Sequence, residues 1–171
     1  PMYAELLVLR VVHIFGAVVW AGTSLFVAYF LMPAMGQAGP AAAPVMVALV
    51  KRKLFVIVPV VAVIMMLAGL RLMWITSSGF SAEYFATRSG MNYSTGAILA
   101  LVAFTIFMTV NHPAVGRIMQ LGQQIAQAPE AERAPLMAQL NAIRGRAAMG
   151  SLITAVLLTL TTVTMAIGRY V

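Results

Sequence analysis

The sequence predicts an all-α integral membrane protein, an antiparallel four-helix transmembrane bundle with short interfacial helices in its inner loops. Its composition points to this class, because 62% of the 171 residues are hydrophobic and only 9% are charged. A soluble globular chain has roughly 25% charged residues, so a soluble protein is excluded. In addition, the apolar residues gather in four long stretches that shorter, more polar segments separate.

Each apolar stretch is long enough to cross a bilayer as a helix, since ~30 Å of hydrocarbon requires ~20 apolar residues. We predict spans over residues 6–32, 54–75, 97–115 and 147–167. With their loops they make residues 1–171 a single transmembrane domain and leave no room for an extramembrane catalytic domain. The lipid bilayer is therefore the first partner that the sequence predicts.

The basic residues indicate how the chain is oriented. Its formal net charge is +7, but Lys and Arg stand near the ends of the spans. That placement is typical of topology signals and of contact with anionic lipid headgroups, and no nucleic-acid partner is expected. The positive-inside rule predicts that both inner loops lie in the cytoplasm and that both termini lie outside. The two inner loops then carry Lys51, Arg52, Lys53, Arg117, Arg133, Arg144 and Arg146, and the outer side carries Arg10, Arg71, Arg88 and Arg169.

Both inner loops have the pattern of interfacial helices. Residues 39–53 are apolar with a basic end, which favours a segment lying along the membrane surface. Residues 129–146 have acids early and arginines late, as suits a helix dipole. Within them Leu136, Leu140 and Ile143 recur at i, i+4 and i+7, an amphipathic stripe suited to the membrane or a partner.

Several kinds of chemistry are excluded by what the sequence lacks. It has no cysteine, which removes disulfides, iron–sulfur clusters, thiolate metal sites and covalently attached c-type haem. The four acidic residues lie in terminal or loop segments, so no buried carboxylate pair is expected for acid–base work or proton pumping. These acids are Glu5, Glu83, Glu130 and Glu132.

The first span carries a face with an imidazole, a small residue and an aromatic residue. His13, Gly16 and Trp20 stand at i, i+3 and i+7, so they share one side of a helix. A b-type haem needs an axial imidazole, room for its macrocycle and aromatic packing. Arg10, one turn from His13, and Arg71, at the same outer level, suit the haem propionates.

Each of these residues also has a role that needs no cofactor. His13 can hydrogen-bond to a neighbouring helix, as polar residues in membrane bundles commonly do. Trp20 can serve as packing, and the two arginines can extend to lipid phosphates.

The string His13-x-x-Gly16-x-x-x-Trp20-x-Gly22, preceded by Leu9-Arg10, resembles the opening helix of several small bacterial membrane families. These are the CopD-like copper-resistance proteins, the membrane domain of cytochrome-fused urate oxidases and the HemJ-type protoporphyrinogen oxidases. In HemJ-type proteins the matching histidine is regarded as a haem b ligand, so the resemblance implies that role for His13. The chain lacks the membrane lysine expected of HemJ-type enzymes, and CopD-like proteins usually have more spans, so their activities are not carried over.

The second histidine lies in the string Asn111-His112-Pro113 at the inner end of the third span. The proline removes a helix hydrogen bond and frees the carbonyl of Thr109. Such a kink suits a second haem, a quinone headgroup or a proton path, and equally a polar bend without a ligand. Sharing one haem with His13 is not expected, because their depths differ by roughly 20 Å at 1.5 Å per residue.

We therefore expect a haem b redox protein in which His13 is the metal ligand and a quinone is a candidate electron partner. The alternative is a cofactor-free subunit that packs in a larger respiratory or photosynthetic complex, or in a homo-oligomer. Copper handling by Met and His is a weaker alternative, since the thirteen methionines show no clustered spacing.

Overall fold

The computed structural model describes residues 2–171, and within them every regular element is helical, with no strand. Four helical segments are long and apolar enough to cross a membrane: Tyr3–Ala38, Leu54–Thr76, Arg88–Gln127 and Glu130–Ile167. The all-α class and the four long apolar helices are therefore confirmed. The second segment matches the predicted span at 54–75 within one residue, whereas the other three extend well beyond their predicted spans.

The first half of the chain forms two long helical segments joined by a short helix. In order, its elements are α1 (Met2–Phe26), the π-helical segment η1 (Val27–Leu31), α2 (Met32–Ala38), the 3₁₀ segment η2 (Gly39–Ala42), α3 (Ala43–Lys51) and α4 (Leu54–Thr76). Lys53 has a left-handed backbone with φ of 57° and stands between α3 and α4. A helix, α3, is thus present between the first two long segments, where the sequence predicted one.

The second half has a short capping helix followed by two very long helices. Its elements are α5 (Ala82–Ala86), α6 (Arg88–Ile106), the π-helical segment η3 (Phe107–Asn111), α7 (His112–Gln127) and α8 (Glu130–Ile167). A hydroxyl side chain stands at the start of both α5 and α6: Ser81 accepts a hydrogen bond from the Tyr84 amide, and Thr87 accepts one from the Gly90 amide. These are N-caps, which satisfy amides that have no partner within the helix.

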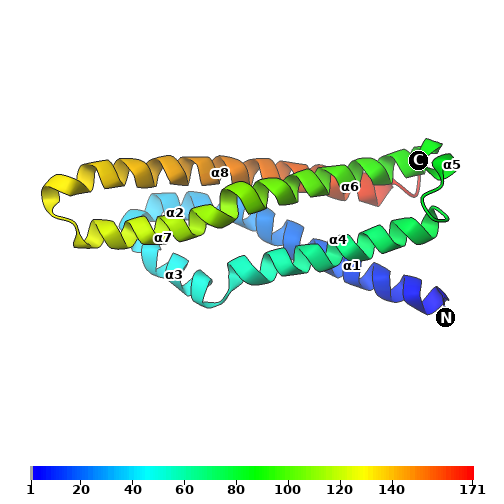
Figure 1. The fold of residues 1–171 in the computed structure, drawn as a ribbon, viewed down its shortest axis with the longest axis horizontal. Helices are drawn as coiled ribbons and strands as arrows, with labels where there is room; N and C mark the ends of the chain where they lie inside the picture. Colours follow the sequence, from blue (N-terminus) through cyan, green and yellow to red (C-terminus); the bar gives the residue numbers. More distant parts are fainter. Residues whose placement is uncertain (1) are drawn as a thin grey trace.

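The long helices lie side by side, and both termini are at the same end, together with α5 (Figure 1). α1 packs along α4, α6 packs along α8, and α1 also contacts α8. The α6–α7 segment has 40 residues and α8 has 38, so each is about 60 Å long. A bilayer core is ~30 Å thick, so only about half of each can lie in hydrocarbon when the helix stands upright.

The segment 130–146 differs from the separate interfacial helix that the sequence predicted. It is the first part of α8 and continues without a break into the last apolar span. Its apolar stripe packs against α7, and Leu140 (α8) and Leu121 (α7) are both buried. The stripe therefore has a partner within the chain, and the α7–α8 hairpin projects past α2 and α3 in Figure 1.

Both π segments end two residues before a proline. The amide of Met32 donates to the Val27 carbonyl, and that of His112 donates to the Phe107 carbonyl, each five residues back. Pro33 and Pro113 follow, and a proline can neither donate to the preceding turn nor fit closely against it. The wider π turn accommodates the proline without breaking the helix.

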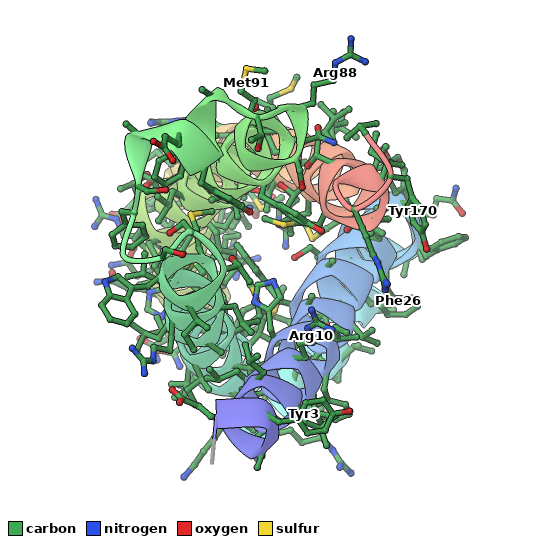
Figure 2. All side chains as sticks on the ribbon, turned by 90° about the vertical axis from the view of Figure 1, so that its right-hand side faces the viewer. Tyr3, Arg10, Phe26, Arg88, Met91 and Tyr170 are labelled. Atoms are coloured by element: carbon green, nitrogen blue, oxygen red, sulfur yellow. The ribbon has the colours of Figure 1, made fainter. Side chains whose placement is uncertain are left out.

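The core lies where the four long helices meet, and the outer faces are apolar. Its central cluster contains Trp20, Val58, Ala62, Met65, Ala100, Ala103 and Leu158. Many large apolar side chains point outward, among them Phe15, which is 68% exposed, and Leu67 and Ile98, which are both 60% exposed. Figure 2, viewed from the end with both termini, shows this fringe of outward side chains, including Tyr3. A surface of this kind suits contact with lipid.

Candidate functional site

His13 lies in the contact between α1 and α4, and its ring is held by the backbone of α4. Its Nδ1 is 2.9 Å from the carbonyl oxygen of Met65. Because a carbonyl oxygen only accepts, Nδ1 must carry the proton in this bond, and Nε2 of a neutral ring then has a lone pair. Within residues 2–171 Nε2 makes no hydrogen bond. Histidines that bind metals commonly have this arrangement, in which one nitrogen donates to a carbonyl and the other coordinates.

Two glycines let α1 and α4 approach closely at this point. A Cβ on Gly69 of α4 would lie 2.5 Å from Cε1 of His13, so the imidazole rests directly on the glycine backbone. A Cβ on Gly16 of α1 would lie 2.6 Å from Cβ of Met65. Small residues at such crossings are typical of membrane bundles. The space that the sequence assigned to a flat ligand beside Gly16 is therefore occupied by Met65.

Trp20 lies two turns further along α1, in the centre of the bundle. It is 1% exposed and meets the ring of Phe104 edge-on, with 6.0 Å between ring centroids. Its indole Nε1 is buried and has no hydrogen-bond partner in the described residues. Trp20 therefore lies in the core, where it packs against α4, α6 and α8.

Arg71 is paired with a carboxylate that the sequence analysis placed in a terminal segment without a role. Its Nη2 is 2.7 Å from Oε1 of Glu5, and its Nε donates to the same oxygen at 2.8 Å. The guanidinium also lies 4.8 Å from the ring centroid of Trp74. The start of α1 is thereby tied to the last part of α4. Arg10 is exposed and makes no ion pair within residues 2–171.

We expect the Glu5–Arg71 pair to contribute little to stability. Both side chains are nearly half exposed, and exposed pairs typically stabilise by about 0–1 kcal/mol. Glu5→Gln should therefore lower the thermal unfolding temperature in detergent only slightly, and the small difference should vanish in high salt. Glu83→Gln, in exposed α5, is the matched control. A large loss for Glu5→Gln alone would show that the pair anchors α1.

His112 and Asn111 have different surroundings. His112 is exposed at the start of α7, with its ring 6.5 Å from that of Phe107. The Asn111 side chain reaches α8, where its Nδ2 donates to the Ala147 carbonyl at 2.9 Å and to the Ser151 hydroxyl at 2.7 Å. The structure does not bring the two histidines into one set of contacts.

Residues 2–171 contain no group of three or more His, Asp or Glu side chains that could hold a metal ion. A haem needs only axial ligands and a pocket, so the question of fit concerns the His13 ring. The tautomer is the right one for coordination, and the ring is only partly buried. Its Met65 and Gly69 sides are closed by α4, so only the remaining side of the ring is left for a macrocycle, and His13 lines neither of the two hollows described below.

The sequence pattern identified the face of α1 but not its partners on α4. Met65 and Gly69, which contact this face from α4, lie outside the motif. Ala62 and Gly69, two small residues seven positions apart on one face of the second span, are the signal that marks the contact face. The chain matches no protein-family model, and comparisons with curated proteins and with solved structures gave no match.

Proposed function

We propose that this protein is a haem b electron carrier embedded in the membrane, with His13 as an axial ligand. The observation that carries the proposal is the hydrogen bond from His13 Nδ1 to the Met65 carbonyl, which fixes the ring and leaves Nε2 for a metal. The opening-helix motif with His13, Gly16 and Trp20 supports it by resemblance. When bound, the haem supplies one-electron exchange.

The residues around His13 have separate tasks in this proposal. The Met65 carbonyl orients the imidazole, and Gly69 gives the ring a backbone surface to rest on. Arg10, one helical turn before His13 and without an ion pair in the described residues, is placed to bind a propionate. Arg71 can do so only by leaving Glu5.

The membrane setting of the proposal follows from the charges and the apolar surface. We propose an antiparallel transmembrane bundle in a bacterial inner membrane, with both termini outside and the basic loops in the cytoplasm. α3, which ends in Lys51, is the proposed interfacial helix. A lipid-soluble quinone is the proposed electron partner, since it dissolves in the phase that the spans occupy.

A second candidate function is that of a cofactor-free subunit in a larger membrane complex or a homo-oligomer. The close packing of Gly16 on Met65 and of His13 on Gly69 favours it, because these contacts explain all four residues as a helix–helix joint. The outward apolar side chains of every long helix would then include the surface that a partner covers.

The visible spectrum of the purified protein separates the two functions. Protein from haem-replete cells should show a Soret band with reduced α and β bands. His13→Ala should remove these bands, because the iron loses its ligand, whereas His112→Ala should keep them and is the matched control. His13→Gln adds a further test, since its amide can still donate to Met65 but cannot replace the imidazole as a ligand.

Two results would contradict the haem proposal. One is a wild-type protein without a Soret band, and the other is an unchanged spectrum in His13→Ala. If the His13 variants lose stability while no variant or wild type has a haem spectrum, the joint between α1 and α4 is the function of this histidine.

A further inference from the structure

An internal cavity of about 80 Å³ lies between the two π segments, on the part of α1 that follows Trp20. Val27 and Leu31 of η1 line one side, and Phe107 and Asn111 of η3 line another. The two segments belong to different long helices, and π turns within helices are frequent at functional sites. Both described π segments therefore border the same internal space, away from His13.

A second hollow of about 360 Å³ adjoins this cavity and leads outward. It shares several lining residues with the cavity, among them Thr23 and Leu54, and adds Gly22 and Phe26. Phe26 is 54% exposed, on the apolar outer surface of α1. The cavity thus opens sideways between α1, α3 and α4, toward the surface proposed to face lipid. The outer hollow is by itself within the size range of small-molecule sites, roughly 300–1,000 Å³.

The inner part of the cavity contains a buried hydroxyl without a partner. Thr154 of α8 lines the cavity and is 2% exposed, and its Oγ1 makes no hydrogen bond in the described residues. The other threonines of α8 all donate to carbonyls of their own helix: Thr159, Thr161, Thr162 and Thr164. A buried polar group is normally paired, so this hydroxyl is available to a molecule in the cavity.

Two further polar residues of the lining have defined roles. Nδ2 of Asn111 donates to the Ala147 carbonyl, which can only accept, so the orientation of the amide is settled. The Ser151 hydroxyl accepts from the same Nδ2 and keeps its own proton to donate. Oδ1 of Asn111 is buried and has no partner in residues 2–171. The cavity therefore offers hydroxyl donors at one end, and no charged side chain lines it.

We propose that this cavity binds the head ring of a lipid-soluble quinone. An uncharged lining favours an uncharged ligand, since a carboxylate or phosphate would be buried there without a counter-charge. The Thr154 hydroxyl can donate to a quinone carbonyl, the rings of Phe55 and Phe107 line the space for a flat head group, and the sideways opening lets an apolar tail reach lipid. The redox role of the site rests on the proposed function, whereas quinone binding itself requires no haem.

Quenching of tryptophan fluorescence measures this binding directly. Trp20 and Trp74 are the two tryptophans, and Trp20 belongs to the same core cluster as Val58, which lines the cavity. In a Trp74→Phe background, protein in phosphatidylcholine nanodiscs is titrated with decylubiquinone, and saturable quenching of Trp20 is expected. Thr154→Val should weaken binding about tenfold, the loss of one hydrogen bond. Thr162→Val, an isosteric change at an exposed, self-bonded threonine, should leave it unchanged.

A second pair of variants tests the entrance. Gly22 lines the outer hollow, and a Cβ there would meet nothing within 4 Å, so Gly22→Leu can fold while filling the opening. Gly116 is equally open but lies outside both hollows, which makes Gly116→Leu the matched control. Gly22→Leu should weaken or slow quenching, and Gly116→Leu should not. Thermal unfolding of each variant in the same nanodiscs checks that it is folded.

Three outcomes would overturn the inference: quenching that never saturates, equal affinity for Thr154→Val and Thr162→Val, or displacement of decylubiquinone by diacylglycerol, which would assign the site to neutral lipids. The haem spectrum of the same samples is recorded in parallel. Quinone binding without a Soret band would overturn the proposed function alone, and a Soret band with no saturable quenching would overturn this inference alone.

Discussion

Gly69→Val is expected to separate α1 from α4 and to destabilise the protein by roughly 2–3 kcal/mol, as overpacking of a tight contact does. A Cβ at this position would overlap the His13 ring, and valine adds two methyl groups beyond it. The ring cannot move away without losing its hydrogen bond to the Met65 carbonyl. Thermal unfolding in detergent, followed by circular dichroism, measures the loss.

The matched control for this change is Gly116→Val, at an exposed position of α7. A Cβ there meets nothing within 4 Å, so the same substitution has the same effect on helix propensity but causes no clash. It should alter stability by less than about 1 kcal/mol. Equal unfolding temperatures for the two variants would show that α1 and α4 do not meet at Gly69 as described.

Trp20→Ala is expected to have a comparable or larger effect. The side chain is the largest that is fully buried, and it contacts residues of α4, α6 and α8 in one cluster. In a bilayer the hydrophobic transfer term is small, so the loss comes from the void and the missing van der Waals contacts. We estimate a destabilisation of about 2–4 kcal/mol, toward the low end of values for soluble cores.

Trp74→Ala provides the comparison for this prediction. That tryptophan is 45% exposed near the end of α4, so its removal creates no internal void. Its loss should cost no more than its contact with Arg71, about 0.5–1 kcal/mol. The two variants are compared by thermal unfolding in the same detergent. A Trp20→Ala protein as stable as Trp74→Ala would mean that the four helices do not meet around Trp20.

The apolar stretches predicted the fold class well and the helix ends poorly. The span at 54–75 agrees because the left-handed Lys53 precedes α4 where its apolar run begins, and Ser77 and the left-handed Ser78 follow α4 where that run ends. The other helices continue beyond their apolar runs because polar residues do not stop a helix. In α8 the polar part packs on α7 through Leu140, so tertiary contacts stabilise a helix that hydropathy does not detect.

The candidate site could be predicted only as far as a single helix extends. The spacing of His13, Gly16 and Trp20 places them on one face of α1, and the structure confirms that Trp20 and Gly16 are buried there. Which residues of α4 lie opposite depends on the register between two helices, which no spacing within one helix contains. For that reason Gly69 and the Glu5–Arg71 pair were missed. The unpaired hydroxyl of Thr154 could not be predicted either, because the sequence does not distinguish this threonine from the other threonines of α8, which bond to carbonyls of their own helix.

The π segments have a consequence for how α1 is oriented relative to α2, and α6 relative to α7. A turn closed by a bond to the fifth residue back, in place of the fourth, holds one extra residue. The residues after Leu31 are therefore rotated about the helix axis relative to the face of α1 that bears His13. In the same way, the residues after Asn111 are rotated about the helix axis relative to α6. The segments Tyr3–Ala38 and Arg88–Gln127 therefore each consist of two helical parts, and the faces of the two parts are offset around the helix axis.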